Sequence, residues 1–277
     1  MSAGRRLVPL AFALVLVVSA GVRSNVAVAQ GRGAPSPIQG REGALIDLTG
    51  QWVSVITEDW RWRMMTPPRG DTASVPLNPA GRKVAEAWDL DADRARGDLC
   101  KAFGPPGIIR QPGRLRIRWE NEQTLLLEFD AGSQMRRLHF GSPPPAGGRT
   151  LQGHSEARWF RQPVNRGIFG RGGAARGGSL HVVTTDLAAG YLRPNGVPYS
   201  ERAVVKEFFD RFTLPDGDGT WLIVTTVVND PEYLTQEFVI SSQFKQEVDG
   251  SRWNSRPCEI LSPVDPGTRP GQRALYQ

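Results

Sequence analysis

The chain has 277 residues, 39% of them hydrophobic, with two cysteines and a formal net charge of +6. Only four of its 34 basic residues are lysines, a bias that indicates genome composition rather than a phosphate-binding face, so we expect no nucleic-acid partner. The length suits one large β domain or two small ones.

The first 29 residues are predicted to form a cleavable signal peptide. Arg5 and Arg6 precede an apolar run over 7–20, and small residues at 27 and 29 suit a signal peptidase. The run has 14 residues, fewer than the roughly 20 of a membrane-spanning helix. We therefore expect cleavage near Ala29, a periplasmic or extracellular protein and no membrane insertion. The paired arginines also fit twin-arginine export, but the residues after them favour the general secretory route.

Removal of this leader takes away three arginines and no acidic residue, which lowers the net charge from +6 to +3. Residues 30–44 are rich in Gly and Pro and poor in apolar residues, a composition typical of a flexible linker. We predict one β-rich domain over 45–260 and a C-terminal tail over 261–277.

The first predicted strand covers about 51–58, where β-branched and aromatic residues alternate with polar ones. One short helix follows it. Asn78 is its predicted cap, Pro79 occupies the first turn, and Val84 and Trp88 lie four apart on one face. We expect this helix to end near Leu90.

Regular alternation begins after Cys100. The segments 114–120, 125–130 and 135–140 each place apolar residues at every second position and are separated by short polar turns, which predicts a meander. Further strand patterns follow, interrupted by a Gly/Arg-rich segment over 165–178 that we interpret as a surface loop. In total we predict nine or ten antiparallel strands, closed as a single barrel or packed as a sandwich.

The two cysteines, Cys100 and Cys258, are predicted to form a disulfide, because an even cysteine count in an exported protein favours pairing. A redox dithiol would place the two cysteines close together in the sequence, and these two are far apart. The bridge would tie the first third of the chain to its last part, which favours one domain over two.

A possible active site appears in the segment 151–160, where His154, Ser155 and Glu156 are adjacent. Side chains alternate along a strand, so His154 and Ser155 point to opposite faces and cannot form a catalytic pair. Two readings of the other face remain open. His154, Glu156 and Arg158 are either solvated, or they line a cavity.

Another strand carries ionisable residues on both faces. Glu207 lies beside Val205 and Phe209, and Lys206 lies between Val204 and Phe208. One charge must therefore point inward and needs a partner, for which Arg137 or Arg158 is available. The three histidines, His139, His154 and His181, fall on successive strands, but no short ligand spacing supports a zinc site.

Gly50-Gln51-Trp52 resembles the G-x-W motif of lipocalins, in which the tryptophan closes one end of an eight-stranded barrel. The chain differs from lipocalins in its length, in its Gly/Arg insertion and in its helix, which follows the first strand rather than the eighth.

A second resemblance covers about residues 98–258 and connects the chain with a group of secreted bacterial β-rich proteins without assigned function. The shared pattern comprises a G-H-S-x-x-x-W strand from Gly153, an L-x-V-x-T-T strand from Leu180, a G-x-P-x-S-E loop from Gly196, an E-x-F strand from Glu207, a D-P-x-Y turn from Asp230 and a late cysteine, Cys258. The Gly/Arg insertion departs from it. The resemblance implies a shared fold and export, not a reaction.

These patterns predict a soluble exported barrel that binds a small, mostly apolar ligand in its interior, with no cofactor and no metal. The predicted contacts are Arg137, His154, Arg158, Tyr199 and Glu207. One alternative is a barrel enzyme in which Glu207 or His154 acts as general base in proton transfer, elimination or hydrolysis. Another is an envelope interaction module with a filled interior and an exposed apolar patch. The sequence identifies no catalytic residue, ligand or oligomeric state.

Overall fold

The computed structural model describes residues 35–141, 147–161, 177–215 and 217–263. The predicted signal peptide, most of the Gly/Arg-rich segment and the chain beyond 263 lie outside these residues. In the described part, no helix is both long and apolar enough to cross a membrane.

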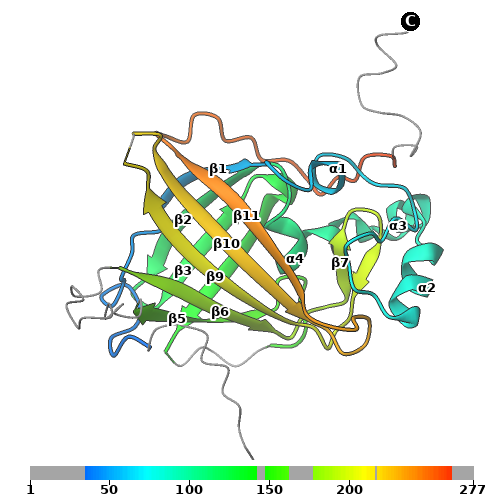
Figure 1. Cartoon of the computed structure of the whole chain (residues 1–277), viewed down its shortest axis with the longest axis horizontal. Coiled ribbons are helices and arrows are strands. Elements are labelled where there is room, and N and C mark those ends of the chain that lie inside the picture. The colour runs from blue at the N-terminus through cyan, green and yellow to red at the C-terminus, as the bar shows by residue number, and fades with distance from the viewer. Residues whose placement is uncertain (1–34, 142–146, 162–176, 216, 264–277) are drawn as a thin grey trace, which may run out of the picture. The chain divides into compact units, whose positions relative to one another are not determined.

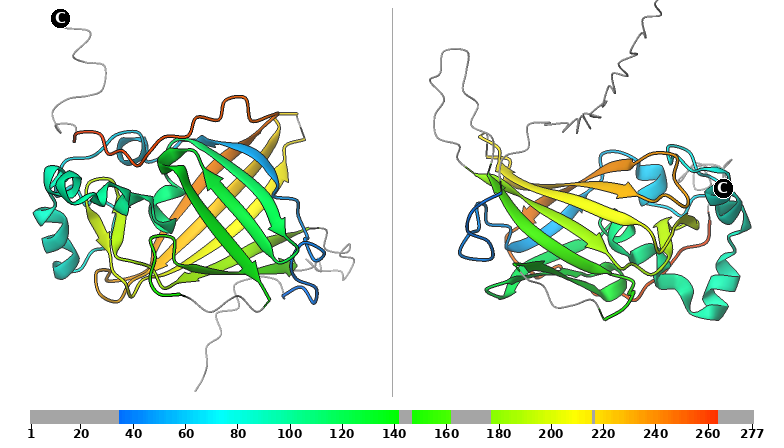
Figure 2. Two further views of the ribbon diagram at one scale, coloured as in Figure 1. Left: turned by 180° about the vertical axis from the view of Figure 1, so that it is seen from behind. Right: turned by 90° about the horizontal axis from the view of Figure 1, so that it is seen from below.

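Nine strands close into a barrel in the order β1-β11-β10-β9-β6-β5-β4-β3-β2 (Figures 1 and 2). This confirms the predicted β-rich barrel and excludes the sandwich. The strands are β1 (Gly50–Val55), β2 (Arg114–Asn121), β3 (Thr124–Phe129), β4 (Gln134–Phe140), β5 (His154–Arg161), β6 (Gly178–Thr185), β9 (Val204–Thr213), β10 (Thr220–Asn229) and β11 (Phe238–Glu247). A separate hairpin consists of β7 (Gly190–Arg193) and β8 (Val197–Tyr199).

One pairing differs from the predicted antiparallel pattern. β4 and β5 run parallel, with Leu138 opposite Ser155 and Phe140 opposite Ala157. Parallel neighbours need a connection of roughly a dozen residues to return to the starting end, and residues 141–153 separate these two strands. The connection from β4 to β5 is therefore not one of the short hairpins that the sequence predicts.

Several short helices lie between β1 and β2, where the sequence predicts one. They are α1 (Trp60–Arg63), α2 (Pro79–Ala87), α3 (Leu90–Arg96), η1 (Asp98–Phe103) and α4 (Pro105–Ile108); η2 (Ala131–Ser133) connects β3 to β4. The predicted helix is α2: the Asn78 side chain accepts a hydrogen bond from the Gly81 N–H, and Pro79 is its first residue. The helices from α2 onward and the β7–β8 hairpin lie at one end of the barrel (Figure 1).

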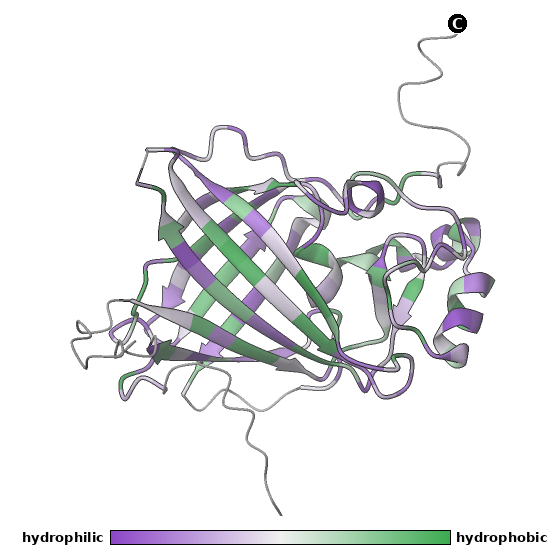
Figure 3. Cartoon of the chain, viewed as in Figure 1, coloured by the Kyte–Doolittle hydropathy of each residue, from purple (hydrophilic) through white to green (hydrophobic). Residues whose placement is uncertain are grey.

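The barrel wall alternates between inward and outward residues, and Figure 3 shows this as bands of opposite hydropathy along β9, β10 and β11. The inward residues form two hydrophobic clusters. One contains Trp52, Leu127, Trp159 and Phe209. The other contains Val205, Val228 and Ile240 and continues into the hairpin and α2.

Cys100 and Cys258 form a disulfide, as predicted. It joins η1 to the extended segment after β11 and closes a sequence separation of 158 residues. Such a bond is typical of an oxidising, extracytoplasmic compartment.

Residues 36–48 form a strap that covers one end of the barrel. The Ser36 N–H donates to the Trp159 carbonyl, and the Trp159 indole N–H donates to the Gly40 carbonyl. The Arg41 N–H donates to the Glu122 carbonyl at 2.9 Å. Residues 36–44, predicted as part of a flexible linker, are thus attached to the barrel, because their backbone groups find partners on β5 and on the turn after β2.

Candidate functional site

A layer of polar side chains crosses the barrel interior between the two hydrophobic clusters. It draws one inward residue from each of six neighbouring strands: Arg136, Ser155, Thr184, Glu207, Thr226 and Ser242. On β9 the order is Val205, Glu207, Phe209, so the polar residue lies between a member of each cluster. Thr226 of β10 lies directly opposite Glu207 in the strand register.

Arg136 and Glu207 form the centre of this layer. Arg136 Nη1 donates to Glu207 Oε1 at 2.9 Å and Nη2 donates to Oε2 at 2.6 Å. Both side chains are at most 1% exposed. Arg136 Nη2 also contacts Thr184 Oγ1, which is hydrogen-bonded to Ser155 Oγ at 2.8 Å. A buried charge needs such pairing to be tolerated.

Four buried polar atoms around this pair have no hydrogen-bond partner among the described residues. They are Arg136 Nε, Thr226 Oγ1, Ser242 Oγ and Tyr199 Oη. The Tyr199 ring lies against Gly104 and Gly190, where a Cβ would come within 2.4 Å of its oxygen. Burial raises the pKa of the Tyr199 hydroxyl, and the positive charge of Arg136 acts in the opposite direction. This hydroxyl therefore stays protonated.

Two of the predicted contact residues, Glu207 and Tyr199, lie in the interior. The expectation that Arg137 or Arg158 pairs with Glu207 is wrong, because Arg136 is the partner. Arg137 is on the outside of β4 and forms an ion pair with Glu120 at 2.8 Å. The pattern did contain a signal: Arg136 alternates with Leu138 and Phe140, which are buried, whereas Arg137 alternates with the exposed Met135 and the half-buried His139.

The outer face of β5 carries the other predicted residues. Glu156 and Arg158 are exposed, and Ser155, Ala157 and Trp159 are buried, so the solvated reading of this face is confirmed and the cavity reading is wrong. His154 is half-buried and stacks on His139, with 5.4 Å between ring centroids. Neither residue faces the barrel interior.

No group of three or more potential metal-ligating side chains occurs in the described residues. His181, the third histidine, has its Nε2 within 2.8 Å of Ser179 Oγ and stacks on Phe160 with 3.9 Å between centroids. Burial lowers the pKa of His139, and the nearby His154 and Arg137 act in the same direction. These histidines belong to the outer packing of the wall.

A cavity of about 200 Å³, lined mainly by apolar residues, lies at the end of the barrel beneath the strap. Its lining consists of strap residues and barrel residues: Ala44, Leu45, Ile46, Asp47, Leu48, Trp119, Leu125 and Trp159. Two of the eight are tryptophans and one is charged. None of the five predicted contact residues lines it.

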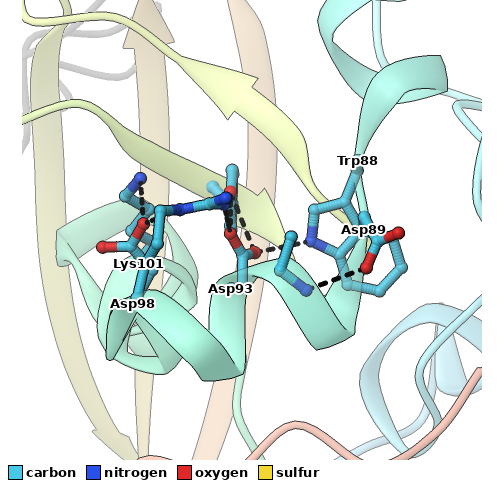
Figure 4. A network of polar contacts seen from close by, with 8 residues as sticks. Trp88, Asp89, Asp93, Asp98 and Lys101 are labelled. Carbon is cyan, nitrogen blue, oxygen red and sulfur yellow. Dashed lines mark hydrogen bonds and ion pairs between the residues drawn. The ribbon is translucent and has the colours of Figure 1, made fainter.

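A second cavity, of about 360 Å³, lies between α2, α3 and the hairpin. Asp93 in its wall is buried and accepts hydrogen bonds from Trp88 Nε1 at 2.9 Å, from Tyr191 Oη at 3.0 Å and from Arg96. Asp98 next to it contacts Lys101 at 2.9 Å (Figure 4). Asp89 caps α3 through the Ala92 N–H. These acidic groups are satisfied within the protein, so the network holds the helices against the hairpin.

Comparisons of the chain with protein-family models, with curated proteins and with solved structures found no match in any of the three. The two resemblances drawn from sequence motifs therefore stay predictions.

Proposed function

We propose that this protein is an exported β-barrel that binds a small, mostly apolar molecule, and that the molecule enters the barrel at the strap-covered end. The observation that carries the proposal is the cavity between Leu45, Trp119, Leu125 and Trp159. Ligand sites are typically concave and apolar, with aromatic walls and few polar groups. The lining of this cavity includes two tryptophans and several aliphatic side chains.

The size of the cavity limits the ligand. An empty apolar cavity of about 150 Å³ is large enough for benzene, so a volume of about 200 Å³ suits a molecule of one or two rings. The two tryptophans offer flat faces for stacking, and Asp47 at the rim is the one ionisable group in the lining. A neutral aromatic compound fits these surroundings better than an anion.

Export rests on the predicted signal peptide together with the disulfide between Cys100 and Cys258. A barrel enzyme has less support than a binding protein. Both oxygens of Glu207 face the guanidinium of Arg136, and the half-buried His154 stacks on His139 outside the barrel. Neither group lines any of the three cavities found among the described residues, where it would exchange a proton with a substrate.

The proposal is tested with 1-naphthol as a neutral two-ring probe. Titration is followed by tryptophan fluorescence and by ligand-observed NMR, and saturable binding with one equivalent is expected. Ala44→Trp adds a large side chain at the exposed rim of the cavity and should weaken binding by at least about tenfold, equivalent to ~1.4 kcal/mol.

The matched control is Val239→Trp, which adds the same group to the outer face of β11, where Val239 is 58% exposed. It should leave the affinity for 1-naphthol unchanged. The absence of saturable binding, or equal affinities for wild type and Ala44→Trp, would remove the proposal.

A further inference from the structure

Three buried arginines meet beside the helical end of the barrel, outside the cavity of the proposed function. Arg63 ends α1, Arg110 follows α4, and Arg193 ends β7. Their exposed fractions are 4%, 4% and 1%. Segments far apart in the sequence thus bring three permanent positive charges into one buried region.

Two of these three guanidinium groups, those of Arg63 and Arg193, have donors without a partner among the described residues. Arg63 Nε donates to the Arg110 carbonyl at 3.1 Å, but Arg63 Nη1 and Nη2 have no partner among the described residues. The same holds for Nε and Nη1 of Arg193. The guanidinium carbon of Arg193 lies 4.6 Å from the ring centroid of Trp62, so its face is covered while its edge donors stay unpaired.

Glu58, Asp59 and Asp71 act on these arginines, but most of the positive charge has no direct ion pair among the described residues. Arg110 Nη2 pairs with Asp59 Oδ2 at 3.0 Å, and within the described residues this is the only ion pair that any of the three arginines forms. Burial, and after it the neighbouring Arg110, lower the pKa of Arg63 and of Arg193 to about 10, although nearby carboxylates act in the opposite direction. The lowered pKa means that burial disfavours the charged form of these arginines. A bound anion would offset this electrostatic cost.

Arg63 also lines a cavity of about 290 Å³. The cavity wall combines two basic residues, Arg63 and Arg256, and one acidic residue, Glu259, with Gln111 and with apolar residues, among them Phe103, Met64 and Leu261. Met64 is 52% exposed and Leu261 is 60% exposed, so two large apolar side chains stand at its rim. Pro257, Glu259 and Ile260 of the same wall follow or flank Cys258, and the disulfide holds them in place.

We propose that this cavity binds a small organic carboxylate, whose carboxylate group accepts hydrogen bonds from Arg63 and whose apolar body lies between Phe103, Met64 and Leu261. Guanidinium groups match the planar geometry of a carboxylate with two parallel hydrogen bonds. The apolar walls favour an organic acid over inorganic phosphate. The positive charges of Arg110 and Arg193 would add electrostatic attraction for the carboxylate.

The experiment measures binding of octanoate to the wild-type protein by isothermal titration calorimetry. Octan-1-ol has a similar apolar body without the charge, and acetate and inorganic phosphate have the charge without the body. Octanoate is expected to bind at least about tenfold more tightly than each of the three, because charge-assisted hydrogen bonds and apolar contacts act together only in octanoate. Phosphate that binds as tightly as octanoate would overturn the assignment to an organic acid.

Arg63→Met separates a ligand site from a structural role. It should weaken octanoate binding about 10- to 100-fold, the range expected for one lost charge-assisted contact. The melting temperature should fall only slightly, because the protein loses the hydrogen bond from Nε to the Arg110 carbonyl but no partner of the Nη atoms. Arg61→Met is the matched control: Arg61 belongs to the same helix, is exposed and pairs with Asp71. It should leave octanoate affinity within about twofold.

A second variant covers the case in which Arg63→Met folds poorly. Leu261→Asp places a negative charge at the exposed rim and should weaken octanoate binding, because it removes an apolar contact and repels the carboxylate. Unchanged octanoate binding in both Arg63→Met and Leu261→Asp would overturn the proposal. Ala44→Trp, which fills the cavity at the opposite, strap-covered end, should not alter octanoate affinity. The proposal for this site and the proposal for the strap-covered site can therefore be tested independently.

Discussion

Arg136 of β4 and Glu207 of β9 face each other inside the barrel and are joined by two hydrogen bonds, of 2.9 and 2.6 Å. The pair marks the level at which the two hydrophobic clusters of the interior meet. A buried ion pair is expensive to form and more expensive to break on one side only. Its contribution can therefore be measured by comparing single and double replacements.

Glu207→Leu should lower the free energy of unfolding by about 3–5 kcal/mol, because Arg136 is then buried without its partner. The double variant Arg136→Met/Glu207→Leu should recover most of this loss. Urea unfolding of the four proteins gives the coupling energy as a double-mutant cycle. A loss below about 1 kcal/mol in the single variant would show that Arg136 reaches water or another acceptor.

Tyr199, which is buried, and Tyr191, which is half-buried, lie on the two strands of one hairpin and can be compared. The Tyr199 hydroxyl has no hydrogen-bond partner in the described structure, so Tyr199→Phe should leave the free energy of unfolding unchanged or raise it by up to about 1 kcal/mol. The Tyr191 hydroxyl donates to Asp93 at 3.0 Å, so Tyr191→Phe should lower it by about 1.5–3 kcal/mol.

The same pair tests the predicted ligand role of Tyr199. Tyr199 does not line the cavity beneath the strap, so Tyr199→Phe should leave the affinity for 1-naphthol unchanged. A reduced affinity with maintained stability would instead show that the Tyr199 hydroxyl contacts the ligand.

The disulfide should be a major source of stability. Replacing Cys100 and Cys258 together by Ala should lower the free energy of unfolding by about 2–5 kcal/mol, since the bond closes a long loop in the unfolded chain. The bond also holds the wall of the proposed carboxylate site. Octanoate binding to folded, reduced protein should therefore weaken, as measured by calorimetry with and without a reductant. Identical urea midpoints for the oxidised and reduced protein would contradict the stabilising role.

His139 should make stability fall in mildly acidic solution. Burial lowers the pKa of His139 in the folded protein, so the unfolded chain binds the proton more readily. The contribution is fully present above the unfolded pKa of about 6.5 and is lost as the pH falls from there toward the lower folded value. Urea unfolding between pH 8 and 5 should show a smaller decline for His139→Gln than for wild type. Glu120, Arg137 and His154 also act on this ring, so parallel curves would assign the decline to other groups.

Much of the architecture follows from local patterns in the sequence. Alternation along 114–140 identifies β2, β3 and β4, because a strand exposes every second side chain to the same face. Asn78 and Pro79 identify the start of α2, because a helix N-terminus needs a side-chain acceptor and tolerates a missing N–H. Because the chain has only two cysteines, Cys100 and Cys258 are the only possible partners for an intramolecular disulfide.

The functional sites depend on tertiary structure. Alternation shows that Arg136 and Arg137 point to opposite faces of β4. Closure of the barrel decides which of the two faces is inside, and the inner face is the one that carries Arg136. Likewise, no periodicity relates Arg63, Arg110 and Arg193, because they come from a helix end, a loop and a strand end that only the folded chain brings together. Local periodicity reports which residues share a face. Burial, ion pairing and cavities arise from contacts between distant segments, and these contacts are decided when the barrel closes.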